Sequence, residues 1–191
     1  MKIGIDIDNT ILNTLPILKK YINNYIRILD KGYIMNENGF CSSNLCNWVW
    51  EDEYDFCLKY LELTVSTAEI FEHVKEVVEL LKENGHEIHF ITARSKPHFK
   101  DPYKISEAIL KQKEIPYDYL VVECSDKRTY CKANGIELLI DDEPHNIIEV
   151  AKDIPVIVLK GLQNEKCIGN NVVKVNDWYE IEMYFREHNI L

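Results

Sequence analysis

Residues 2–11 read KIGIDIDNTI, a short apolar run that ends in two aspartates and a threonine. The apolar residues up to Ile7 are typical of a buried strand. A buried carboxylate is costly unless it is paired with a cation or holds a metal ion. Asp6 and Asp8 therefore lie either on an exposed rim of the fold or in a functional site.

The composition favours a globular chain with a small-molecule partner. The 191 residues are 46% hydrophobic and 28% charged, which suits one well-packed domain. The net charge of −10 argues against a nucleic-acid polymer or an anionic membrane as the main partner. It is compatible with a small phosphorylated ligand if a bound cation reverses the local field. The sequence has no signal-peptide pattern, and its six cysteines form no C-x-x-C pair. We therefore expect reduced thiols and a cytoplasmic location.

Strand and helix patterns alternate along most of the chain. Strands are expected at residues 2–8, 87–92, 118–123, 137–141, 155–159 and 172–175. Helices are expected at residues 14–29, 52–63, 67–84, 103–113, 128–134, 145–152 and 177–187, with a Ser66–Glu69 capping box and a Gly85 cap at the ends of 67–84. This alternation predicts a Rossmann-like α/β fold, a parallel sheet with helices on both faces.

Residues 12–66 interrupt the alternation. The first strand, the helix at 67–84 and the strand at 87–92 make one βαβ unit, and residues 12–66 are inserted into it. Inserts of this length rarely lack structure of their own. We expect a small, mostly helical cap at 12–66, over a core formed by residues 1–11 and 67–191.

Four of the expected strands end in polar residues. These residues are Asp6, Asp8 and Thr10, then Thr92 and Arg94, then Lys127, then Asp141 and Asp142. The carboxyl ends of parallel strands share one edge of the sheet, where ligands bind. Two like charges about 4 Å apart repel by roughly 4 kcal/mol at an effective dielectric constant near 20. The aspartates therefore favour a hard cation such as Mg²⁺, and Lys127 and Thr92 supply donors for a phosphoryl group.

The four segments resemble the four motifs of the haloacid dehalogenase-like phosphohydrolase superfamily. DIDNT at 6–10 resembles the first motif, Asp-x-Asp-x-Thr, and FITAR at 90–94 resembles the second. Lys127 resembles the third motif, and LLIDDEP at 138–144 the acidic fourth. The segment 76–95, together with LIDDEP and the DK before it, is also similar to the 5'(3')-deoxyribonucleotidases and their bacterial nucleotidase relatives. Asn9 replaces the glycine of many members, and asparagine tolerates a left-handed backbone.

The resemblance implies a Mg²⁺-dependent phosphomonoesterase that acts on nucleoside monophosphates. Asp6 would be the nucleophile that forms an aspartyl-phosphate. Asp8 would protonate the leaving alcohol and then act as the base that activates water. The metal ligands would be Asp6, the backbone carbonyl of Asp8, and Asp142.

The remaining motif residues would support this reaction. By the same resemblance, Thr92 and Lys127 would hold the phosphoryl oxygens, and Thr10 would brace the loop. Asp141 would act on the metal through water or orient Lys127. Lys132 also precedes the acidic strand, but it lies in the middle of an expected helix, so we favour Lys127.

Two further assignments stay open. Arg94 either contacts the substrate phosphate or pairs with a surface acid. The aromatic residues of the insert either stack on a nucleobase or form the small core of the cap. They are Tyr33, Phe40, Trp48, Trp50, Tyr54 and Phe56.

Two other functions compete with the nucleotidase hypothesis. The same site would serve a phosphatase for a sugar phosphate or another small phosphoester. A receiver-like phospho-acceptor or binding module also places acids, a threonine and a lysine around Mg²⁺. In such modules, however, the phosphorylated aspartate follows a later strand, and no insert of this size follows the first.

Overall fold

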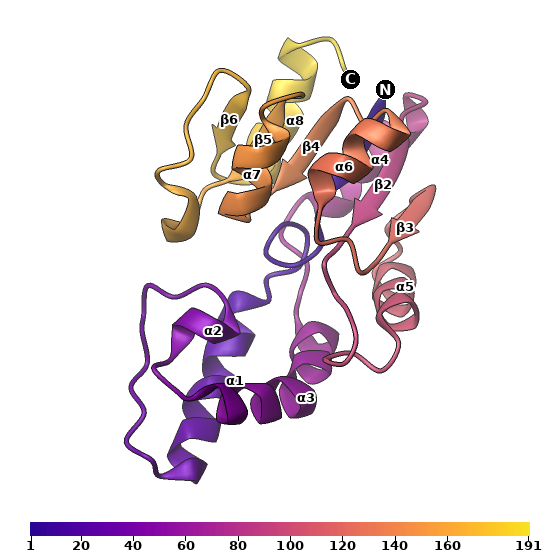
Figure 1. Cartoon of the computed structure of the whole chain (residues 1–191). Coiled ribbons are helices and arrows are strands. Elements are labelled where there is room, and N and C mark those ends of the chain that lie inside the picture. The colour runs from indigo at the N-terminus through magenta and orange to yellow at the C-terminus, as the bar shows by residue number, and fades with distance from the viewer.

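The computed structural model describes residues 1–191 and contains one six-stranded sheet in the order β3-β2-β1-β4-β5-β6, with every neighbouring pair parallel (Figure 1). The strands are β1 (Lys2–Ile5), β2 (Glu87–Ile91), β3 (Tyr119–Val121), β4 (Leu138–Asp141), β5 (Val156–Leu159) and β6 (Val172–Val175). The chain builds outward from β1 to β3, then returns to the other side of β1 to place β4. The strand order therefore reverses between β1 and β4, where open α/β sheets bind ligands.

Helices cover both faces of the sheet, as predicted. The helices are α1 (Leu15–Leu29), α2 (Ser42–Leu45), α3 (Trp50–Thr67), α4 (Val74–Glu83), α5 (Pro102–Gln112), α6 (Lys127–Asn134), α7 (Pro144–Val150) and α8 (Trp178–Glu187). One hydrophobic cluster joins the sheet to α4, α5 and α8, and a second joins its other face to α6 and α7. On β4, Leu138 and Ile140 belong to the first cluster and Leu139 to the second, as the two-residue period of a strand requires. None of the helices combines the length and apolar character that a membrane crossing requires.

A glycine lets the central strand fit between its neighbours. A Cβ atom at Gly4 would lie 2.9 Å from Cδ1 of Ile91 and 3.0 Å from Cδ1 of Leu139. Both distances are shorter than ordinary carbon contacts, so a side chain at this position of β1 would displace the core packing. Gly4 thus leaves room on one face of β1 for the side chains of Ile91 and Leu139.

The inserted segment forms a separate helical group beyond the carboxyl ends of the strands (Figure 1). Its helices α1, α2 and α3 have their own hydrophobic cluster, which includes Ile22, Tyr25 and Phe56. The two chain segments that connect this group to the core lie side by side and are joined by backbone hydrogen bonds. Asn13 N donates to Glu69 O at 2.8 Å, and Phe71 N donates to Ile11 O at 3.0 Å.

The predicted helix over 67–84 is wrong in its first half. Helix α3 continues to Thr67, and α4 begins only at Val74, after His73 with a φ of 69°. Ile70 instead forms an antiparallel bridge with Leu12, so its burial comes from this bridge and not from a helix face. The Ser66 hydroxyl donates to Glu62 O inside α3, and the predicted capping box with Glu69 does not form. Gly85 does adopt the left-handed conformation expected after α4.

Candidate active site

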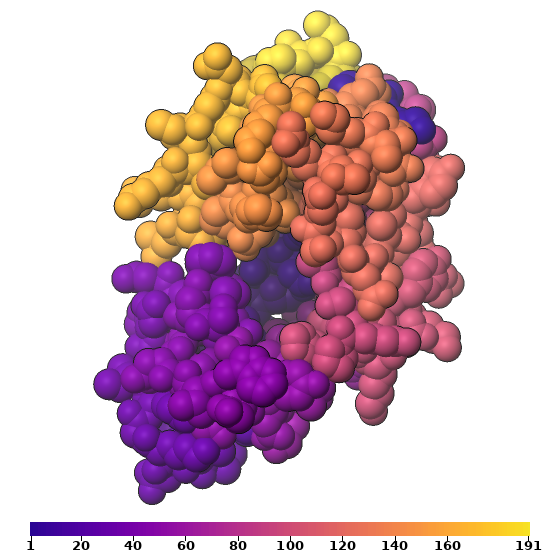
Figure 2. All heavy atoms as spheres, in the orientation of Figure 1, coloured from indigo at the N-terminus to yellow at the C-terminus, as the bar shows by residue number.

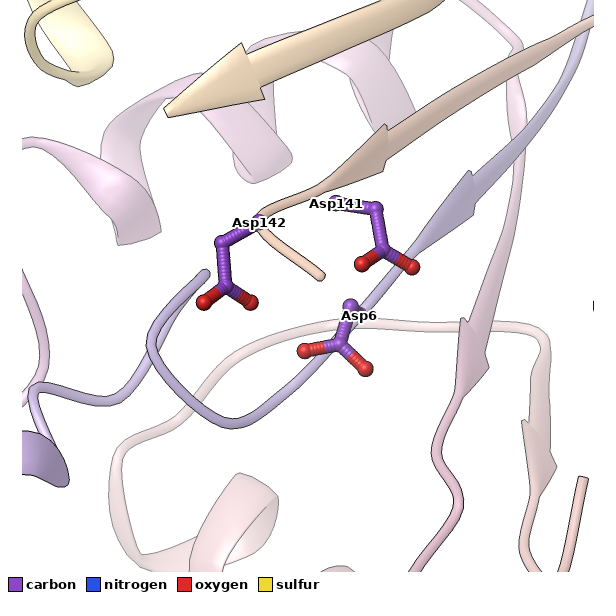
Figure 3. A group of neighbouring side chains, drawn as sticks. All are labelled: Asp6, Asp141 and Asp142. Atoms are coloured by element: carbon purple, nitrogen blue, oxygen red, sulfur yellow. The ribbon is translucent and has the colours of Figure 1, made fainter. Parts of the chain in front are cut away.

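The acidic groups at the ends of β1 and β4 lie side by side. Asp6 follows β1 directly, and its backbone N–H still donates to Ile140 O of β4 at 2.9 Å. The side chains of Asp6, Asp141 and Asp142 lie close together where β1 and β4 end (Figure 3). One oxygen from each lies within 4.8 Å of the others, and all three residues are buried. The structure thus brings the carboxylate of Asp6 next to those of Asp141 and Asp142, which lie far from it in the sequence.

The loop after β1 turns sharply. Ile11 N and Leu12 N both donate to Ile7 O, at 3.0 and 2.9 Å. Asn9 has the left-handed φ of 56° that this turn requires, and its side-chain oxygen accepts from Leu15 N at 2.9 Å. The strand therefore ends at Ile5, earlier than predicted, because the residues after Asp6 form this loop.

Lys127 is buried between two of the carboxylates. It is the first residue of α6, which Asp126 caps by accepting from Thr129 N at 3.0 Å. Its Nζ atom donates to Asp141 Oδ2 at 2.7 Å and also to Asp6 Oδ1. Lys132, the alternative that the sequence left open, is exposed and pairs with Asp153. Of the two lysines, only Lys127 lies at the acidic cluster.

Asp141 has donors on both of its oxygens. Oδ1 accepts from Glu143 N at 2.8 Å, while Oδ2 accepts from Lys127 and from Asn146 Nδ2 at 3.1 Å. A carboxylate held in this way orients the Lys127 ammonium group. Asn146 was not predicted, because its contribution depends on how the first turn of α7 folds back onto Asp141.

Asp142 is bound by residues of two loops. The Thr10 hydroxyl donates to its Oδ1 at 3.3 Å, and Gln163 Nε2 donates to its Oδ2 at 3.1 Å. Thr10 is fully buried, and its carbonyl accepts from Trp178 Nε1 at 2.9 Å. Thr10 therefore links the loop after β1 to Asp142. Gln163 lies outside the four motifs and has no sequence signal.

Arg94 pairs with an acid of the site. Its Nε and Nη2 atoms donate to the two oxygens of Asp8, both at 2.8 Å. The predicted alternatives were a substrate phosphate and a surface acid, but Asp8 lines the same pocket as Arg94. Thr92 also lines this pocket, and its hydroxyl accepts from Arg94 N at 3.3 Å.

The site carries more negative than positive charge. Asp6, Asp8, Asp141 and Asp142, together with Glu143 at the same cavity, face only two cationic side chains, Lys127 and Arg94, which leaves a formal charge of −3. Burial raises the pKa of Asp6 to about 7; Lys127 opposes this shift, while Asp141 and Asp8 add to it. Burial, then repulsion from Asp6 and Asp141, raises the pKa of Asp142 well above its usual range. Burial tends to lower the pKa of Lys127, but Asp141 and Asp6 hold it above its ordinary value. A divalent cation bound here would offset most of this excess negative charge.

A cavity of about 420 Å³ opens over these groups. Figure 2 shows a hollow between the purple inserted segment and the orange part of the core, with atoms of the indigo N-terminal segment at its base. The core contributes the charged and polar groups of the cavity. The opposite wall is mostly apolar and consists of Leu18, Phe40, Cys41, Ser42, Leu61, Thr64, Val65 and Phe99, the last from the core.

The aromatic residues of the insert divide into two groups. Phe40 lines the cavity and the other five do not. Phe56 is fully buried and stacks on Tyr60 with ring centroids 5.2 Å apart, while Tyr33 and Trp48 pack around the same cluster. Trp50 and Tyr54 stack on each other outside the cavity. Phe99 was missed, because only the chain path after β2 brings it to the cavity.

Known proteins resemble this chain along nearly its whole length. No family model matches it. Putative nucleotidase YqfW of Bacillus subtilis is 29% identical over 186 residues, which cover 94% of this chain and 91% of that protein. Putative nucleotidase BH1399 of Halalkalibacterium halodurans is 25% identical over 194 residues, which cover 97% and 93%.

Solved structures show the same fold. The crystal structure of a predicted phosphoglycolate phosphatase from Haemophilus somnus matches with a TM-score of 0.64 and 17% identity, over 95% of this chain and 96% of that one. A HAD-superfamily hydrolase from Geobacter sulfurreducens matches with a TM-score of 0.63. These comparisons agree with the resemblance read from the four motifs: the chain shares its fold with solved haloacid dehalogenase-like hydrolases, and its sequence is similar to those of bacterial proteins named as putative nucleotidases.

Proposed function

We propose that the protein is a Mg²⁺-dependent phosphomonoesterase that hydrolyses nucleoside monophosphates, with residues 12–66 as a cap over a core of residues 1–11 and 67–191. The observation that carries this proposal is the contact of Asp6 with Lys127, beside Asp142, at the base of the cavity. The nucleotidase names of the sequence relatives support it. A cytoplasmic location remains our expectation from the sequence.

The residues at the base of the cavity fit a magnesium ion. Asp6 and Asp142 would hold it with carboxylate oxygens and Asp8 with its backbone carbonyl, all hard oxygen ligands of the kind Mg²⁺ prefers. Burial and neighbouring carboxylates raise the pKa values of Asp6 and Asp142, so a cation bound between them would favour their charged forms. When bound, Mg²⁺ supplies positive charge that offsets the excess of carboxylates and of substrate phosphate.

In the first half of the reaction, the Asp6 carboxylate attacks the phosphorus atom. A bond forms between an Asp6 oxygen and phosphorus, and the bond from phosphorus to the alcohol oxygen breaks. Asp8 gives its proton to that oxygen, so the product leaves as a neutral alcohol. Lys127 and the Thr92 hydroxyl donate hydrogen bonds to the phosphoryl oxygens, where negative charge accumulates.

In the second half, Asp8 acts in the opposite direction. Its carboxylate takes a proton from a water molecule, and the water oxygen bonds to phosphorus. The bond between phosphorus and Asp6 breaks, which releases inorganic phosphate. Asp6 is again a free carboxylate and Asp8 is again protonated, ready for the next substrate.

The cap-side wall favours a nucleoside as the leaving group. Phe40 and Phe99 present aromatic rings to the cavity, beside the aliphatic Leu18, Leu61 and Val65. A nucleobase stacked on an aromatic side chain gains about 1–3 kcal/mol. A sugar phosphate has no base that could stack on these rings.

The test is phosphate release from a substrate panel with Mg²⁺ and with EDTA. The panel contains 5'- and 3'-nucleoside monophosphates, in ribose and deoxyribose forms, and several sugar phosphates. We expect Mg²⁺-dependent turnover that is fastest on nucleotides. Turnover on sugar phosphates alone would replace the substrate class but keep the mechanism. No Mg²⁺-dependent turnover by a folded protein would overturn the proposed function.

A further inference from the structure

We infer that Arg94 is a positioning residue: it fixes the Asp8 carboxylate in the orientation from which Asp8 exchanges protons with the leaving alcohol and with water. The inference rests on the proposed function, because it assigns a role toward the general acid and base of that reaction. It concerns a contact between the segments that follow β1 and β2, and the motif resemblance assigned Arg94 no role of its own.

Arg94 is the one side-chain partner of Asp8. Arg94 donates from Nε to Asp8 Oδ2 and from Nη2 to Oδ1, both at 2.8 Å, in the parallel two-bond geometry that binds a carboxylate most firmly. The Asp8 side chain is 32% exposed at the cavity, whereas that of Arg94 is only 2% exposed. A partly exposed carboxylate is thus held by a buried cation.

The guanidinium group is itself fixed from the core. Its Nη1 atom donates to Ser106 Oγ at 3.1 Å, and the Ser106 hydroxyl in turn donates to Pro102 O at 2.7 Å. The ring of Phe99 lies 5.8 Å from the guanidinium carbon. Ser106 is fully buried in α5, so the chain of contacts from α5 through Arg94 to Asp8 lies within the core and not in the inserted segment.

This arrangement leaves Asp8 able to react. A carboxylate offers about four lone-pair positions, and Arg94 occupies two of them. The other two stay available on the cavity side. Without Arg94, the carboxylate would rotate freely, and the positive charge of Lys127 and of a bound cation would draw it toward Asp6. A misplacement of about 1 Å in a catalytic group costs about 100-fold in rate.

The test compares Arg94→Ala with the wild type on two substrates. One is a nucleoside monophosphate, whose leaving alcohol needs a proton, and the other is p-nitrophenyl phosphate, whose leaving group departs without one. With the nucleotide, we expect kcat to fall about 100-fold while KM stays within a few-fold. With p-nitrophenyl phosphate, we expect a burst of p-nitrophenol equal to the enzyme concentration, then slow turnover, because only the second half still needs Asp8.

Other outcomes are equally informative. A large rise in KM on both substrates, with no burst, would show that Arg94 binds the phosphate directly and would overturn the inference. An Arg94→Ala enzyme with the wild-type kcat would also overturn it. Inactivity of the wild type on both substrates would instead be a failure of the proposed function, which the burst experiment tests separately.

Three further variants separate positioning from folding. Ser106→Ala keeps Arg94 but removes one of its anchors, so we expect a smaller fall in kcat and a small burst; it decides the question if Arg94→Ala does not fold. Arg94→Lys keeps the charge but loses the two-bond geometry, so we expect it to behave like Arg94→Ala. Arg186→Ala, at an exposed arginine paired with Glu182 on α8, is the matched control and should keep wild-type kinetics.

Discussion

The base of the cavity, at the carboxyl ends of β1 and β4, differs in kind from the wall that the inserted segment contributes. At the base, charged side chains are buried and held by named partners, as in the contacts of Lys127 with Asp6 and Asp141. The wall carries no charged group, and its helices pack mainly on their own cluster. In the proposed function, the base carries out the reaction on the phosphoryl group and the wall selects the alcohol attached to it.

The strongest test of the base is removal of the proposed nucleophile. Asp6→Asn should lower kcat on every substrate by about 10⁴-fold or more, because a side-chain amide cannot form the aspartyl-phosphate of the proposed mechanism. Steady-state phosphate release and a thermal melt measure the activity and the fold. Asp30→Asn, at the exposed C-terminal cap of α1, is the matched control and should keep full activity. A tenth of wild-type activity in Asp6→Asn would show that another group is the nucleophile.

Asp142→Asn tests whether the excess negative charge at the base destabilises the folded protein. The raised pKa means that the folded protein keeps a proton on Asp142 at pH values where the unfolded chain has lost it. Protonation of Asp142 contributes its full stabilisation of the fold below the pKa of about 4 that the group has in the unfolded chain. This contribution is lost as the pH rises through the pKa of Asp142 in the folded protein. In EDTA, the variant should therefore melt a few degrees above the wild type at pH 8 and close to it at pH 5.

Magnesium should reverse the order of the two melting temperatures at pH 8. Mg²⁺ at pH 8 should raise the melting temperature of the wild type and have little effect on Asp142→Asn, because the variant lacks one ligand. Thermal melts at the two pH values, with EDTA and with Mg²⁺, give all the comparisons. An equal difference between the two proteins at pH 5 and pH 8 would mean that Asp142 does not titrate as described.

The base was predictable from the sequence because the geometry of a parallel sheet determines which residues lie together. Once strands end at Asp6, Thr92 and Asp141, their following residues must share one edge, whatever the details of packing. The same rule gives no help with Gln163, which reaches Asp142 from a loop after β5. Side chains delivered by loops depend on tertiary contacts, which local patterns do not encode.

The wall was predictable only as a helical insert. Phe40 and Phe56 look alike in the sequence, but Phe56 fills the core of the insert and Phe40 faces the cavity. Residues 31–50 have no hydrophobic period that would distinguish the two roles. The same limit explains the error at residues 67–73, where Ile70 fits a helix pattern but is buried by its bridge to Leu12.

Phe40→Ala tests whether the wall selects nucleosides. Loss of one stacking ring should lower kcat/KM for nucleoside monophosphates by about tenfold. The value for a small phosphoester without a base, such as glycerol phosphate, should change by less than about twofold, because the base of the cavity is untouched. Parallel kinetics on the two substrates measure this selectivity. An equal loss on both would mean that Phe40 supports the catalytic loop rather than the leaving group.

Trp50→Ala should have the smallest effect on activity, and it tests where the wall of the cavity ends. Trp50 is 67% exposed at the start of α3, stacks on Tyr54 with ring centroids 5.1 Å apart, and does not line the cavity. Its removal should change kcat/KM for nucleotides by less than about twofold and stability by less than about 0.5 kcal/mol. A nucleotide-specific loss as large as that of Phe40→Ala would mean that the insert moves when substrate binds and brings α3 over the base. In that case, the wall seen here is only the part of the selecting surface that is in place before substrate enters.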